Sequence, residues 1–138
     1  MKLGMWIFML VNNLLIPAVM IGIGCQYAAK PPQKINGLSG YRTKRSMKNQ
    51  ETWDFAQAYM GKVWRKAGWV LLPLTVLGQA LTLLAPTIGS MCMWSLAPTT
   101  LGVAALIATI FPVERALKKT FDKDGNRLKL FDDKEDLP

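Results

Sequence analysis

The segment NGLSGYRTKRSMKNQETWDFAQAYMGKVW, residues 36–64, decides how this chain is organised, because it is the only long stretch before the C-terminal tail that is not mainly apolar. One long apolar run precedes this segment and two more follow it. Two glycines open it, a basic cluster comes next, and its second half carries apolar residues at helical spacing. We therefore expect a loop at a membrane surface, set among three membrane-spanning helices.

The three apolar runs are long enough to cross the hydrocarbon core of a bilayer, which takes roughly 20 helical residues. They cover about residues 3–25, 67–85 and 91–111. A signal peptide is the alternative for the first run, but that run is longer than the usual hydrophobic region and lacks a clear small-residue cleavage pattern. Pro98 lies early in the third run, so that span either begins before the proline or is a re-entrant segment. The sequence predicts an all-α, multi-pass membrane protein.

Charges outside the spans set the expected orientation. Residues 26–66 carry an excess of basic over acidic side chains, whereas the turn between the second and third spans carries no charge. By the positive-inside rule this loop is cytoplasmic, so the N-terminus lies outside and the C-terminus inside. We expect a membrane domain over residues 1–121 and a polar cytoplasmic tail over 122–138. The net charge of +8 then reflects orientation rather than nucleic-acid binding.

The loop is the candidate functional face of the molecule. Gly37 and Gly40 permit turn conformations in which successive backbone amides can bind an anion. A basic cluster follows them and attracts anionic lipid head groups; it consists of Arg42, Lys44, Arg45 and Lys48. The alternative is that this cluster only sets topology and touches lipid without specificity.

The second half of the loop has the pattern of an amphipathic helix. Asn49 is the predicted N-cap. An apolar stripe follows at three- and four-residue steps, formed by Trp53, Ala56, Met60, Val63, Trp64 and Ala67. We expect an interfacial helix that lies on the inner leaflet before the chain turns into its second span. The stripe would pack on lipid or on the underside of the spans.

Three amides lie at membrane depth. Asn12 and Asn13 are in the first span and Gln79 is in the second. At least one asparagine should face another helix or a polar cavity, and Gln79 is a candidate partner. A role in binding a ligand or peptide is the alternative. Ala18 and Gly22 form a small-residue pair that suits close helix packing.

The chain offers little for catalysis. It has no histidine, no intramembrane carboxylate and no nucleophile–base pair, so we expect neither an enzyme nor a cofactor or metal site. Cys25 and Cys92 fall near opposite membrane faces and should not pair. In the tail, Asp124 and Gly125 predict a turn between short strands that include Phe121 and Leu128, and the last seven residues have a disordered composition.

One pattern in the loop resembles a known family. The pattern GYRT-x-x-S-x-x-N-x-x-x-W runs from Gly40 to Trp53, and PVERALKKTFDKDGNR follows at 112–127. Together with the order of the spans, these residues resemble the SdpI family of bacterial membrane immunity proteins, over most of the chain. This sequence corresponds to a short, three-span form, whereas the best-known member has additional spans before this domain.

The resemblance implies a non-enzymatic membrane protein of Gram-positive bacteria and relatives that protects the cell from a secreted peptide toxin. It also implies signal transduction by docking of a cytoplasmic repressor. The residues expected to bind a partner or anionic lipid are Gly40, Tyr41, Arg42, Lys44, Arg45, Ser46, Asn49 and Trp53. Two alternatives remain open: a small accessory subunit of a larger membrane complex, and lipid-head-group binding or transport by a homo- or hetero-oligomer.

Overall fold

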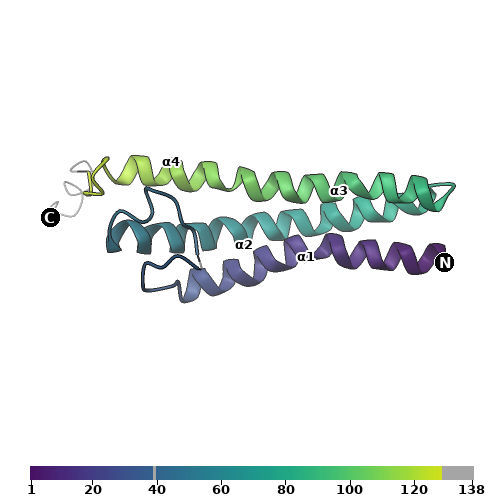
Figure 1. Cartoon of the computed structure of the whole chain (residues 1–138), viewed down its shortest axis with the longest axis horizontal. Helices are drawn as coiled ribbons and strands as arrows, with labels where there is room; N and C mark the ends of the chain where they lie inside the picture. Colours follow the sequence, from purple (N-terminus) through teal and green to yellow (C-terminus); the bar gives the residue numbers. More distant parts are fainter. Residues whose placement is uncertain (39, 129–138) are drawn as a thin grey trace, which may run out of the picture.

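The computed structural model describes residues 1–38 and 40–128, and these residues form a long helical bundle (Figure 1). Its elements are α1 (Lys2–Ala29), α2 (Gln50–Leu81), the short 3-10 helix η1 (Thr82–Leu84), α3 (Ile88–Ala108) and α4 (Ile110–Thr120). Three helical stretches are long and apolar enough to cross a membrane: Lys2–Ala29, Gln50–Leu84 and Ile88–Thr120. The predicted all-α membrane architecture is confirmed.

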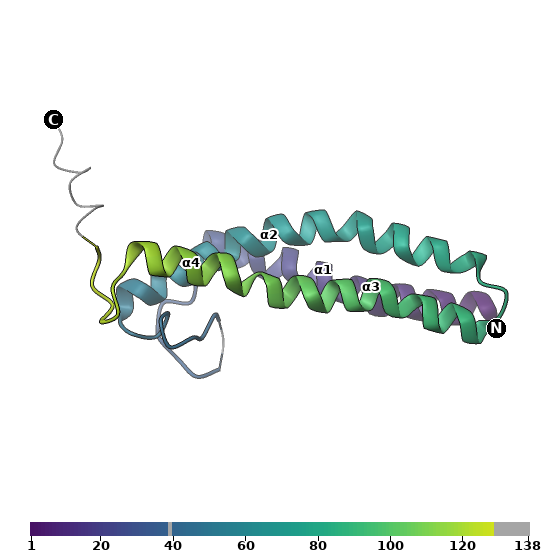
Figure 2. The ribbon, with the colours of Figure 1, turned by 90° about the horizontal axis from the view of Figure 1, so that it is seen from above.

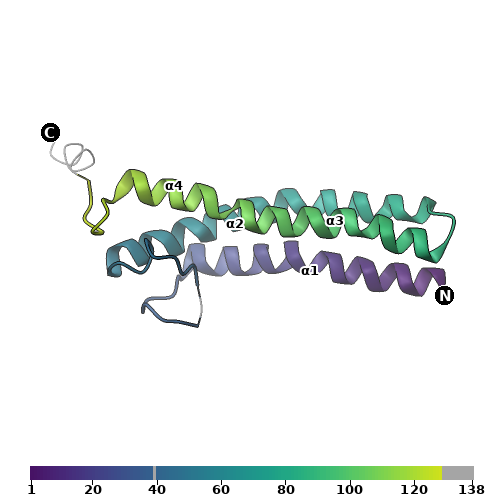
Figure 3. The same cartoon turned by 45° about the horizontal axis from the view of Figure 1, so that its top comes forward.

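The loop between α1 and α2 lies at one end of the bundle. Figures 2 and 3 show it, in blue, at the same end as α4, whereas the N-terminus lies at the opposite end. This end, which we call the polar end, carries most of the charged residues of the chain. The loop is therefore held beside the first turns of α2 and beside α4.

α2 differs from the expected arrangement. It is one continuous helix of 32 residues, so residues 50–66 form no separate helix in the plane of the membrane. The first turns of α2 instead extend the second span beyond the end of α1 and lie beside α4 (Figure 1). The physical reason is that no proline interrupts α2 before Pro73, and its apolar stripe finds partners within the protein.

Glycines allow α1 and α2 to pack backbone against backbone. A Cβ atom at Gly24 would lie 2.5 Å from the backbone nitrogen of Arg65, and one at Gly61 would lie 2.6 Å from that of Ala28. Gly22 has open space around it. The contact between the two helices therefore uses Gly24 and Gly61 rather than the small-residue pair that the sequence pattern suggested.

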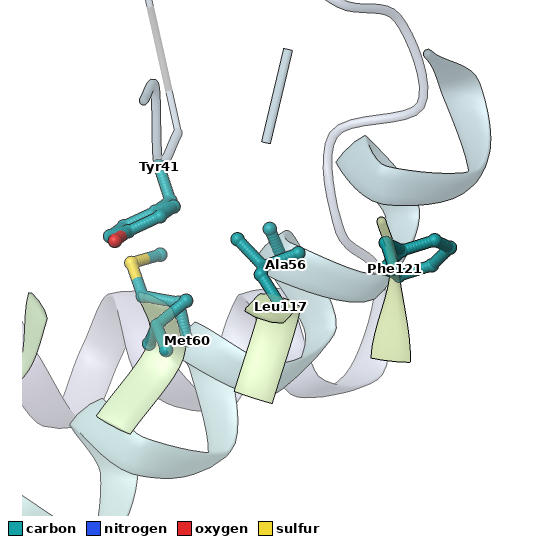
Figure 4. Close-up of a cluster of buried hydrophobic side chains, with 6 residues drawn as sticks. Tyr41, Ala56, Met60, Leu117 and Phe121 are labelled. Atoms are coloured by element: carbon teal, nitrogen blue, oxygen red, sulfur yellow. The ribbon is translucent and has the colours of Figure 1, made fainter. Parts of the chain in front are cut away.

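A hydrophobic core lies at the polar end, where the loop, α2 and α4 meet. Figure 4 shows part of this core, with Tyr41 above Met60. Its buried members are Tyr41, Ala56, Met60, Val113, Leu117 and Phe121. The apolar stripe of α2 thus packs on the loop and α4, while large apolar side chains elsewhere on the spans remain exposed, as suits a lipid-facing surface.

The remaining predictions concern local features. α3 begins at Ile88 and runs through Pro98 without a break, which agrees with a span that starts before the proline.

After α4 the chain makes a turn with an isolated antiparallel bridge between Phe121 and Arg127, in place of two short strands. Cys25 and Cys92 are both free. The disordered composition of the last seven residues falls outside the described part of the chain.

Candidate functional site

Gln57, a side chain of α2, binds the loop backbone at Tyr41 through two hydrogen bonds. Gln57 is fully buried; its Oε1 accepts a hydrogen bond from the backbone N–H of Tyr41 at 2.7 Å, and its Nε2 donates to the Tyr41 carbonyl at 2.6 Å. Gly40 precedes this contact with φ +98°, and a Cβ there would lie 2.6 Å from Gln57 Oε1. Only glycine suits this position, because the backbone is left-handed and the amide lies against it.

The side chain of Tyr41 links the loop to α4. Its hydroxyl donates to Glu114 Oε1 at 2.7 Å, and Glu114 Oε2 lies 3.5 Å from Arg45 Nε. Burial raises the pKa of Tyr41 well above its usual value, and the hydrogen bond to Glu114 and the charge of that carboxylate raise it further. The Tyr41 phenol is therefore a stable hydrogen-bond donor at neutral pH.

Ser46 closes the turn that follows. Its side-chain oxygen is buried, accepts from the backbone N–H of Thr43 at 2.8 Å, and lies 3.0 Å from the carbonyl of Tyr41, to which it donates. The Thr43 hydroxyl oxygen accepts in return from the Ser46 N–H at 3.2 Å. These reciprocal bonds give the Gly40–Ser46 segment a defined conformation without regular secondary structure.

Asn49 is the N-cap of α2, as predicted. Its Oδ1 accepts from the backbone N–H of Thr52 at 2.9 Å, while the Thr52 hydroxyl accepts from the Asn49 N–H, so the two residues form a capping box. The Asn49 amide also donates to the carbonyl of Gly125 at 2.7 Å. Trp53 is fully buried and its indole N–H donates to the Pro32 carbonyl at 2.7 Å. Asn49 thus links the start of α2 to the turn after α4, and Trp53 links α2 to the first part of the loop.

The predicted site residues therefore separate into two groups. One group holds the loop in place from within and consists of Gly40, Tyr41, Ser46, Asn49 and Trp53. Arg45 is half-buried beside Glu114. The other group is exposed and consists of Arg42 and Lys44, with Lys48 near them in the sequence. We call these three residues, Arg42, Lys44 and Lys48, the basic loop face.

A cavity of about 360 Å³ lies between the loop and the bundle. Tyr27, Met60, Trp64 and Leu106 contribute apolar surface to it, while Arg42 contributes a charge. The indole N–H of Trp64 donates to the Thr109 hydroxyl at 3.1 Å, which fixes the ring. A lining of this mixed character suits a molecule with an apolar part and an anionic group.

A second polar cluster joins the three spans at membrane depth. The Asn13 amide donates to Gln79 Oε1 at 2.9 Å, and the Thr99 hydroxyl donates to Asn13 Oδ1. The indole N–H of Trp6 donates to the Gln79 carbonyl at 2.9 Å. Of the two candidate asparagines, Asn13 is thus the partner of Gln79, whereas the side chain of Asn12 is exposed.

Two residues of this arrangement were absent from the sequence-based site. Gln57 lies four residues after Trp53, in phase with the apolar stripe, and a polar residue in phase with such a stripe is a detectable signal. Glu114 carried no comparable signal, because its partner Tyr41 is 73 residues away. Among the described residues, no group of three or more His, Cys, Asp or Glu side chains could hold a metal ion.

Comparison with known proteins decides the family. The family described as "SdpI/YfhL protein family" matches residues 33–113, which include the fastened loop, α2 and α3. The chain belongs to the SdpI/YfhL family. It is also 31% identical over 111 residues to "Uncharacterized protein YfhL" of Bacillus subtilis (strain 168), covering 79% of this chain and 89% of that protein. No solved structure matches.

Membership in the SdpI/YfhL family confirms the resemblance read from the GYRT pattern. With three helices long and apolar enough to span, it identifies the chain as a multi-pass protein of the cell membrane. The matched region contains Gln57 and Trp53, so these two contacts of α2 with the loop involve residues of the part shared with the family.

Proposed function

We propose that this protein is a membrane immunity protein that protects the cell from a secreted peptide toxin, without enzymatic activity. The observation that supports this proposal is the family match over residues 33–113, which cover most of the loop together with α2 and α3. An immunity protein has to intercept a membrane-active peptide or report its presence. A helical membrane domain with a fixed polar end fits both tasks.

We further propose that the polar end is cytoplasmic and that the basic loop face contacts an acidic surface of a cytoplasmic partner such as a repressor. The excess of basic residues in the loop supports this orientation. Arg42, Lys44 and Lys48 are exposed, while the backbone beneath them is held by Gln57 and Ser46. A rigid backbone lowers the entropic cost of ordering such a surface on binding.

A toxin challenge in a sensitive Gram-positive host tests the proposal. Cells that express the wild-type chain should survive a secreted peptide toxin that kills cells carrying the empty vector. The double variant Arg42→Gln/Lys44→Gln should lose signalling through the partner. Lys62→Gln/Lys66→Gln is the matched control, because it removes the same charge from exposed positions on α2.

The outcomes separate the parts of the proposal. Absence of protection across a panel of toxins, at verified membrane expression, would argue against immunity and for an accessory subunit of a larger complex. If Arg42→Gln/Lys44→Gln signals as strongly as Lys62→Gln/Lys66→Gln, the basic loop face does not contact the partner. The proposed immunity function would be unaffected by that result.

Lipid-head-group binding is a second candidate, favoured by the cavity that Arg42 and Trp64 line. A lipid would place its phosphate near the guanidinium and its first methylene groups against the aromatic rings. Native mass spectrometry of the protein with phosphatidylglycerol and with phosphatidylcholine tests this. Retention of phosphatidylglycerol by the wild type but not by Arg42→Gln supports the lipid site, and equal retention of both lipids speaks against it.

A further inference from the structure

Asn12 and Asn13 are neighbours in α1 but face in different directions. Asn13 is 4% exposed and bound to Gln79, whereas Asn12 is exposed. Within residues 1–38 and 40–128, no hydrogen bond to the Asn12 side chain is formed. Residue 12 lies about 15 Å along the helix from its start at Lys2, which is half of a hydrocarbon core of about 30 Å.

An exposed amide at this depth faces hydrocarbon, where its two donors and its acceptor have no partner. Transfer of an amide to such surroundings without a hydrogen bond is unfavourable. Polar side chains within spans accordingly face another helix or a polar cavity. Since the described part of the chain supplies neither to Asn12, a partner from outside this molecule is needed.

The surroundings of Asn12 match a helix–helix contact surface. Seven exposed residues follow one another along α1 at alternating steps of three and four: Met5, Phe8, Asn12, Leu15, Val19, Gly22 and Gln26. This is the heptad spacing of a left-handed helix pair, in which a single asparagine fixes register. A second amide, Gln26, lies two heptads after Asn12 on the same line, which we call the α1 seam.

We propose that the α1 seam binds the α1 seam of a second copy of this protein, with Asn12 paired to Asn12. Two copies inserted in the same orientation are related by a twofold axis along the membrane normal, so their α1 helices run parallel. Residue 12 then lies at the same depth in both copies. Because an amide carries both donors and an acceptor, it is complementary to itself, and Gln26 can pair in the same way. This inference does not depend on the proposed immunity function.

Cysteine cross-linking in native membranes tests the contact. In a Cys25→Ser/Cys92→Ser background, Val19→Cys places a thiol on the seam, and Ala18→Cys places one at nearly the same depth but about 100° around the helix. Both positions are exposed. A membrane-permeant oxidant should convert the Val19→Cys protein to covalent dimer at least several-fold faster than the Ala18→Cys protein. Equal rates, no dimer, or cross-links only to another protein would overturn the proposal.

A second variant tests the amide itself. Asn12→Leu keeps the size of the side chain and suits lipid, so insertion and folding should be preserved. Loss of one interhelical hydrogen bond should weaken dimerisation about three- to thirtyfold, measured by energy transfer between labelled copies diluted in vesicles. Val11→Leu, on the exposed face beside the seam, should leave the dimerisation constant unchanged. A dimerisation constant that Asn12→Leu does not change would remove Asn12 from the interface.

Discussion

Gln57 holds Tyr41 through both ends of its side-chain amide, accepting from the tyrosine N–H at 2.7 Å and donating to its carbonyl at 2.6 Å. A neighbouring β-strand would offer the same pair of bonds to an extended residue. The Gln57 side chain makes the two backbone hydrogen bonds that a neighbouring strand would make, and so it holds the loop backbone against the bundle. The basic loop face is held in position by this contact.

Replacing Gln57 should release the loop. In Gln57→Leu the buried N–H of Tyr41 loses its partner, while the Tyr41 carbonyl keeps only the hydrogen bond from the Ser46 hydroxyl. An orphaned buried donor costs about 1–3 kcal/mol. Hydrogen–deuterium exchange over residues 40–49 should become much faster, while exchange in α3 stays the same. Lys62→Leu, at an exposed position of α2 whose side chain makes no hydrogen bond to the described residues of the loop, is the control. Unchanged exchange in Gln57→Leu would mean that the loop is held by other contacts.

The asparagine–glutamine contact between spans should show energetic coupling. Gln79→Leu removes the acceptor 2.9 Å from the Asn13 amide and leaves that amide only the longer contact with the Ser95 carbonyl. Asn13→Leu leaves the buried Oε1 of Gln79 without its donor. The double variant removes both polar groups, so its loss of stability should be smaller than the sum of the single losses, by about 0.6 kcal/mol on average for such pairs. Unfolding in mixed detergent micelles measures this, and additive losses would indicate no coupling.

Glycines at the α1–α2 contact should be intolerant of a methyl group. Gly24→Ala would place its Cβ 2.5 Å from the backbone of Arg65, which cannot move without shifting the helix. We expect destabilisation of about 1–3 kcal/mol. Gly4→Ala, in open space on the same helix, should be neutral or slightly stabilising. Similar melting temperatures for the two variants would contradict the close approach of α1 and α2.

The Tyr41 phenol should resist ionisation at alkaline pH. An ordinary tyrosine has a pKa of about 10, and burial followed by the Glu114 contact raises the pKa of Tyr41. Because the folded state then holds this proton more tightly than the unfolded state, the stabilising effect is present below pH of about 10 and declines as the pH rises further.

Tyrosinate absorbance checks this expectation. At pH of about 10.5, just above the ordinary tyrosine pKa, folded Tyr41→Phe and folded wild type should give the same tyrosinate signal, because Tyr41 contributes none. After unfolding at the same pH, the wild type should give the larger signal. A larger signal from the folded wild type would show that Tyr41 ionises like a free tyrosine.

The sequence was sufficient for features set by composition and local pattern. Apolar length predicted the three spans, and the preference of asparagine for helix starts predicted the cap at Asn49. The distant Asn13–Gln79 contact was also anticipated, because amides at membrane depth need polar partners. The distant contacts of the loop were not predictable in this way. Gln57 and Tyr41 are 16 residues apart, and Tyr41 and Glu114 are 73 apart, so no local pattern links them. The glycines that carry the α1–α2 contact were missed because every glycine in a span is equally compatible with close packing.

The length of α2 connects the loop to the thickness of the membrane. Its 32 residues span about 48 Å, and a hydrocarbon core of about 30 Å leaves about 18 Å outside. Because Asn49, Trp53 and Gln57 clamp the loop to the first turns of this helix, the loop keeps a fixed height on it. A thicker bilayer would bring Arg42 and Lys44 nearer to the head groups, and a thinner one would lift them away. We therefore expect the distance between the charges of the loop and the lipid surface to change with the thickness of the membrane.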